Sequence, residues 1–95
     1  MHVLAVRFEL IIPHARSLKA KRAAIRPIVD GGRHRFPVSL AEVDHQNTWQ
    51  RAAIGAAVVS SSATLAAETI DELERFVWAQ PDIEVASAER SWLEW

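Results

Sequence analysis

The order of hydrophobic patterns along the chain constrains its fold more than any single motif. Four stretches have strand-like patterns, namely 3–12, 37–43, 49–60 and 83–93. Two others carry apolar residues at helical spacing, namely 18–30 and 63–80. The order strand, helix, strand, strand, helix, strand is the split βαβ pattern of ferredoxin-like folds. Right-handed crossovers then place both helices on one face of a four-stranded antiparallel sheet and leave the other face open.

The length of the chain predicts a single α+β domain spanning residues 1–95. A chain of 95 residues can bury one hydrophobic core but not two. Arg7 and Glu9 interrupt the apolar opening run, so we expect neither a signal peptide nor a membrane span. The chain has no cysteine, which is compatible with a reducing compartment, and a cytoplasmic location is the default expectation.

The first helical stretch contains residues that oppose a helix. Pro27 removes a hydrogen bond from the helix interior, which predicts a kink. Gly31 and Gly32 then supply a backbone that readily leaves the helical conformation. We therefore expect the helix to end near Asp30, with a frayed extension to Arg35 as the alternative.

Charge is divided unevenly along the chain, although the net charge is only −1. Residues 16–35 carry a net charge of +6, and residues 61–95 carry −6. Helical spacing gathers the first group into a basic ridge beside the apolar stripe, with Arg33 joining if the helix continues. The ridge contains Lys19, Arg22 and Arg26, and these three together with Lys21, near the helix N-terminus, are the predicted binding residues of the helix. Two interpretations stay open: the acidic second helix neutralises the ridge, or the ridge binds an external anion such as RNA phosphate or a ribosomal surface.

A polar turn joins the second and third strands, in the sequence Ala-Glu-Val-Asp-His-Gln-Asn-Thr-Trp-Gln-Arg-Ala over residues 41–52. In the functional interpretation it is a recognition turn, with an apolar tryptophan surface and several hydrogen-bond donors. In the structural interpretation Asp44 shapes the turn and Trp49 packs over the end of the core. The candidate binding residues are Asp44, His45, Gln46, Trp49, Gln50 and Arg51.

The open sheet face is a second candidate surface. The outward side chains of the third strand are Arg51, Ala53, Gly55, Ala57 and Val59, and these include no aromatic residue on which RNA bases could stack. Small apolar side chains favour protein contact, so the last four are candidate interface residues of a homodimer. Trp78 is expected on the outer side of the second helix. We expect Trp92 and Trp95 to cover sheet edges, with an interface role as the alternative.

The sequence lacks the usual signatures of catalytic and metal sites. The four histidines show no paired ligand spacing, and there is no Gly-x-Ser-x-Gly motif or cysteine nucleophile. A glycine-rich phosphate loop, as found in acylphosphatases of this fold, does not follow the first strand. We therefore expect a protein that is not an enzyme and that needs no metal and no cofactor.

Two blocks of sequence resemble the bacterial YlxP-like family over nearly the whole chain. They are Ser-Leu-Lys-Ala-Lys-Arg at 17–22 and the turn sequence at 41–52. The chain departs from the family pattern at Pro27, Gly31 and Gly32 and in its C-terminal tryptophans. The resemblance implies a small ferredoxin-like protein without an established activity, often encoded near translation and ribosome-maturation factors. No catalytic residue is carried over, because the family has none assigned.

These observations predict an interaction module that associates with RNA or the ribosome through the basic ridge and the turn. The alternative is a homodimeric protein-binding module that uses the open sheet face.

Overall fold

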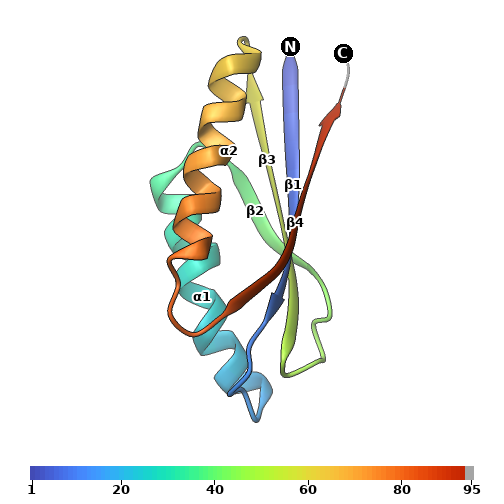
Figure 1. Cartoon of the computed structure of the whole chain (residues 1–95), viewed down its shortest axis with the longest axis vertical. Coiled ribbons are helices and arrows are strands. Elements are labelled where there is room, and N and C mark those ends of the chain that lie inside the picture. Colours follow the sequence, from blue (N-terminus) through green and yellow to red (C-terminus); the bar gives the residue numbers. More distant parts are fainter. Residues whose placement is uncertain (94–95) are drawn as a thin grey trace.

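The computed structural model of the protein describes residues 1–93 and has the predicted ferredoxin-like α+β fold (Figure 1). Its elements are β1 (His2–Ile11), α1 (Leu18–Arg35), β2 (Ser39–Asp44), β3 (Arg51–Ser60), α2 (Ala63–Trp78) and β4 (Glu84–Leu93). All strand pairs are antiparallel, and the order β2-β3-β1-β4 puts β2 and β4 at the edges. Both helices cover one face of the sheet and leave the other open (Figure 1). Within these residues, neither helix is long and apolar enough to cross a membrane.

The core forms between the sheet and the two helices. Alternate residues of the central strand β1 point into it, and Phe8 among them is completely buried. The predicted stripe of α2 supplies Ala66, Ile70, Leu73 and Val77. Serine residues cap both helices, since Ser17 accepts a hydrogen bond from the Ala20 N–H and Ser62 one from the Leu65 N–H.

Helix α1 continues through both glycines to Arg35, so the prediction that it ends near Asp30 is wrong. The glycines serve close packing instead of helix termination. A Cβ atom on Gly32 would lie 2.8 Å from Leu40 Cδ1, and one on Gly31 would lie 3.1 Å from Phe76 Cζ. A side chain at either position would therefore displace the side chain of Leu40 or Phe76.

The hairpin between β2 and β3 contains an irregular backbone. The ladder shifts register between Glu42 and Asp44, and the next residue, His45, has a φ of 61°. This left-handed region is uncommon outside glycine, although histidine enters it more often than most residues. The Asp44 carboxylate accepts a hydrogen bond from the His45 N–H at 2.8 Å, and the Thr48 N–H donates to the His45 carbonyl at 3.0 Å.

Candidate functional site

Lys21 is buried and joins α1 to the hairpin. Only 1% of its side chain is exposed. Its ammonium group donates a hydrogen bond to the His45 carbonyl and lies 2.9 Å from Glu42 Oε2. Lys21, predicted as a binding residue, is therefore not accessible to an external anion. Its position on the wheel faces the sheet, in line with Ile25 and Ile28, and a buried cation must be paired with acceptors.

The side chain of Glu42 is partly buried and partly accessible. Oε2 is buried and accepts no well-directed hydrogen bond from residues 1–93. Its compensation is the nearby ammonium of Lys21, since attraction between charges depends on distance more than on angle. The Glu42 side chain nevertheless keeps 21% of its surface exposed.

Gln50 makes a second connection between the hairpin and the start of α1. Its side-chain amide donates to the Ala15 carbonyl at 3.1 Å and more weakly to that of Pro13 at 3.4 Å. The Ile12 N–H donates to the Gln50 carbonyl at 2.9 Å. The polar groups of Gln50 and Lys21 thus hold the hairpin and the start of α1 together at one end of the molecule, the lower end in Figure 1.

The exposed cations of α1 include Lys19, Arg22 and Arg26. Within residues 1–93 none of them forms an ion pair. Two of the acids of α2, Asp71 and Glu74, bind Arg90 of β4 at 2.7 and 2.9 Å. Within residues 1–93 no ion pair joins α1 to α2, so the interpretation that α2 neutralises the ridge is wrong.

The tip of the hairpin is also exposed. Trp49 keeps 52% of its surface accessible, so the interpretation that it packs over the core is wrong. Its neighbours 46–48 are exposed as well. We call Lys19, Arg22 and Arg26 together with residues 46–49 the helix–hairpin surface. It combines positive charge with an exposed aromatic ring.

The predicted residues Asp44, His45 and Arg51 lie instead in a charged cluster on the open sheet face. We call the cluster, which also includes Arg7 and Glu9, the sheet-face cluster. Arg7 donates to Glu9 at 3.0 Å and to Asp44 at 3.3 Å. His45 Nε2 lies 3.2 Å from a Glu9 oxygen, and Arg51 lies 3.8 Å from the same atom.

These contacts alter the acidity of both carboxyl groups. Burial alone would raise the pKa of Glu9, but the hydrogen bond and charge of Arg7, together with His45, lower it overall. The pKa of Asp44 is lowered first by the hydrogen bond from the His45 N–H and then by Arg7. Sequence reasoning left Arg7 and Glu9 out of the site. Their signal was two charged positions, two residues apart, on the outward face of an otherwise apolar strand.

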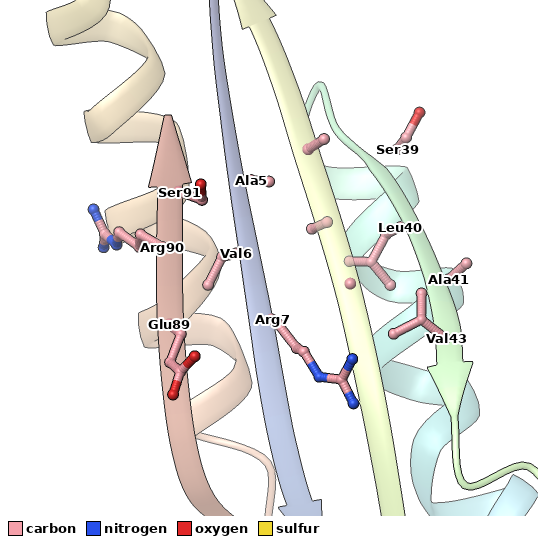
Figure 2. A pocket seen from close by; sticks show the side chains of 13 residues that line it. Ala5, Val6, Arg7, Ser39, Leu40, Ala41, Val43, Glu89, Arg90 and Ser91 are labelled. Atoms are coloured by element: carbon pink, nitrogen blue, oxygen red, sulfur yellow. The ribbon is translucent and has the colours of Figure 1, made fainter. Parts of the chain in front are cut away.

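Beside the sheet-face cluster, the open sheet face forms a trough of about 500 Å³. Figure 2 shows Arg7 and Val43 at one end and side chains of β4 along one side. The floor consists of small residues, Ala5, Gly55 and Ala57. Ala53 is fully buried, so its prediction as an interface residue is wrong. Its cross-strand partners are Glu9 and Asp44, whose side chains share its face and cover it.

The tryptophans outside the hairpin have different environments. Trp78 is 62% exposed on the outer side of α2, as predicted. Trp92 is 44% exposed, and its ring packs edge-on against His2 with centroids 6.5 Å apart. The prediction for Trp95 lies outside the described residues. In the described part of the chain, no three potential ligand side chains come close enough to share a metal ion.

The fold and its charged surfaces define a small ferredoxin-like protein without a recognisable catalytic constellation in residues 1–93. A family model described as "Protein of unknown function (DUF503)" matches residues 3–90, and the chain belongs to this family. The chain is 37% identical over 84 residues to the "Uncharacterized protein YlxP" of Bacillus subtilis (strain 168). The alignment covers 88% of this chain and 91% of that relative, which confirms the YlxP-like resemblance.

A solved structure shares the fold. It is a C-terminal segment of the alpha subunit of aIF2 from Pyrococcus abyssi, with a TM-score of 0.52 and 14% sequence identity. The match covers 96% of this chain and 48% of that one. At this identity the likeness concerns the fold alone.

Proposed function

We propose that the protein is a non-enzymatic, cytoplasmic module that binds RNA, including RNA exposed on the ribosome, through the helix–hairpin surface. One observation carries the proposal: Lys19, Arg22 and Arg26 are exposed and have no ion-pair partner within residues 1–93. Most exposed cations are simply solvated, but these share one face of the helix whose start is held to the hairpin of the exposed Trp49 by Lys21 and Gln50.

The spacing of the three cations suits a phosphate backbone. Residues 19 and 26 are separated by about 10 Å along the helix axis, at about 1.5 Å per residue. One strand of a duplex presents about three phosphates over that length. Trp49 adds a flat ring on which an unpaired base can stack. The exposed amides of residues 46 and 47 are further hydrogen-bonding groups at the same end.

The test is pelleting of the purified protein with ribosomal subunits over a range of salt concentrations. The variant Lys19→Gln/Arg22→Gln/Arg26→Gln removes three positive charges from the helix–hairpin surface. The control, Ser61→Glu/Thr64→Glu/Leu65→Glu, changes the net charge equally at the start of α2, at the opposite end of the molecule (Figure 1). We expect salt-sensitive pelleting that the first variant reduces at least tenfold and the control leaves nearly intact. Equal losses in both variants would contradict the proposal.

A second candidate function is homodimerisation through the sheet-face trough. The observation that favours it is a small-residue floor beside exposed apolar side chains, with Val59 64% and Leu93 56% accessible. Such patches on monomers commonly mark interfaces, and a two-fold axis would place identical patches against each other. Sedimentation equilibrium tests this candidate. Ala57→Arg should convert a dimer into a monomer, and a wild-type protein that sediments as a monomer would exclude it.

A further inference from the structure

A groove of about 210 Å³ runs between α1 and the edge strand β2. It is lined by Arg22, Ile25, Arg26, Val29, Asp30 and Glu42. Ile25 and Val29 form an apolar floor, because the first is buried and the second is half-buried. The two arginines on the rim are exposed. The groove therefore places an apolar surface between guanidinium groups and a carboxylate.

We propose that this helix–edge groove receives one unstacked base of a bound RNA strand. The inference rests on the proposed function and deepens it, since Arg22 and Arg26 belong to both surfaces. Sequence-dependent RNA recognition generally uses bases that have left the stack, held by planar or apolar side chains and read along their polar edges. Arginine guanidinium planes can stack on such a base and also contact its phosphate.

The charges of the groove set the orientation of the nucleotide. Glu42 and Asp30 repel phosphate, whereas Arg22 and Arg26 on the rim attract it. The phosphate accordingly lies at the arginines, and the base points inward to the apolar floor. Its polar edge then meets the Glu42 carboxylate, which accepts hydrogen bonds but cannot donate them when ionised.

Glu42 also determines which bases suit the groove. Its Oε2 atom is buried beside Lys21, so only the exposed part of the carboxylate can reach a ligand. One accessible acceptor matches one exocyclic amino group, which cytosine, adenine and guanine carry and uracil lacks. Carboxylates read cytosine through its N4 amino group in the same way in nucleic-acid complexes. The groove thus adds a base preference that phosphate contacts alone do not give.

The test compares oligocytidine with oligouridine of roughly 12 nucleotides, a length within the range that single-strand binding modules cover. Wild-type protein should bind oligocytidine about tenfold more tightly, as expected for one hydrogen bond to a charged group. Val29→Trp fills the groove and should abolish the preference while keeping the salt dependence. The control Ala23→Trp adds the same side chain at an exposed position of α1 outside the groove, and it should keep the preference.

Glu42→Gln provides a second variant in which the groove stays open. It should reduce the preference severalfold, because the neutral amide oxygen accepts a weaker hydrogen bond than the carboxylate. Folding is checked by circular dichroism, because Lys21 loses its ionic partner. Salt-sensitive binding of both oligonucleotides without a preference, or a preference that survives Val29→Trp, would overturn the groove proposal but not RNA binding. Failure to bind either oligonucleotide or ribosomal subunits would overturn both.

Discussion

The arginines of the sheet and those of α1 have opposite surroundings, although both groups are at the surface. Arg7 on β1 and Arg90 on β4 each contact two carboxylates. Arg22 and Arg26 on α1 contact none within residues 1–93. The positive charges of Arg7 and Arg90 are balanced by carboxylates of the same protein. Those of Arg22 and Arg26 are not, so they contribute a positive electrostatic potential at the surface. This difference supports the proposal that an external anion binds at α1.

Lys21 shows that a cation on α1 can also serve the fold. It lies only two residues from Lys19, yet it is buried against Glu42 and the His45 carbonyl. Lys19 and Lys21 are close in sequence but lie on different sides of α1, and the side of the helix determines whether the cation is exposed or buried.

The largest expected effect comes from Lys21→Met, which should destabilise the protein by about 3 kcal/mol. Removing one member of a buried pair leaves the other without compensation: Glu42 Oε2 loses its ionic partner, and the His45 carbonyl keeps only the hydrogen bond from the Thr48 N–H. Urea unfolding measures the change. The matched control Lys19→Met removes an exposed cation from the same helix and should cost less than about 0.5 kcal/mol. Equal costs for the two variants would contradict the division between structural and available cations.

A second effect concerns the tryptophan of the helix–hairpin surface. Trp49→Ala should weaken RNA binding about tenfold, since stacking of a base on an aromatic ring is worth about 1–3 kcal/mol. The free energy of unfolding should change little, because the ring is half exposed. Trp78→Ala is the control, as Trp78 is at least as exposed but lies on α2. Similar losses in both, measured by fluorescence anisotropy with labelled ribosomal RNA, would show that the hairpin is not part of the site.

The smallest effect is a pH dependence confined to the sheet-face cluster. The pKa values of Glu9 and Asp44 are lowered in the folded state, so their contribution to stability is complete above their ordinary pKa values. It is lost as the pH falls through the lowered values. The difference in unfolding free energy between wild type and Arg7→Gln should therefore shrink in acid. The difference in unfolding free energy between wild type and Arg22→Gln should stay constant, because Arg22 has no acidic partner within residues 1–93.

Urea unfolding of the three proteins at neutral and acidic pH provides the comparison. A wild-type advantage over Arg7→Gln that persists unchanged in acid would mean that these ion pairs contribute nothing to the fold. The helix–hairpin surface would then no longer differ from the sheet face in this respect.

Local patterns were sufficient to predict the element order and the apolar stripe of α2. They failed where the role of a residue depends on a distant partner. Gly32 reads as a helix terminator, but its contact with Leu40 of β2 explains why it is glycine within the helix. Lys21 reads as an exposed cation, because its acceptors are more than twenty residues away in sequence.

The candidate binding residues were likewise predicted only where local patterns determine their exposure. Exposed charge on α1 and the exposed hairpin followed from helical periodicity and turn composition. The sheet-face cluster did not, because it requires the register that brings Glu9 and Asp44 to either side of Ala53. The helix–edge groove likewise needs the placement of β2 beside α1.

The salt dependence of ribosomal RNA binding tests the central claim most directly. Arg22→Gln/Arg26→Gln removes two cations without ion partners in the described chain, and Arg7→Gln/Arg90→Gln removes two that are paired. Both variants change the net charge equally. We predict that the slope of log Kd against log salt falls by about 1.5 in the first variant, at roughly 0.7 to 0.9 per lost phosphate contact, and stays at the wild-type value in the second. An equal fall in both, or a larger one in the second, would contradict the account.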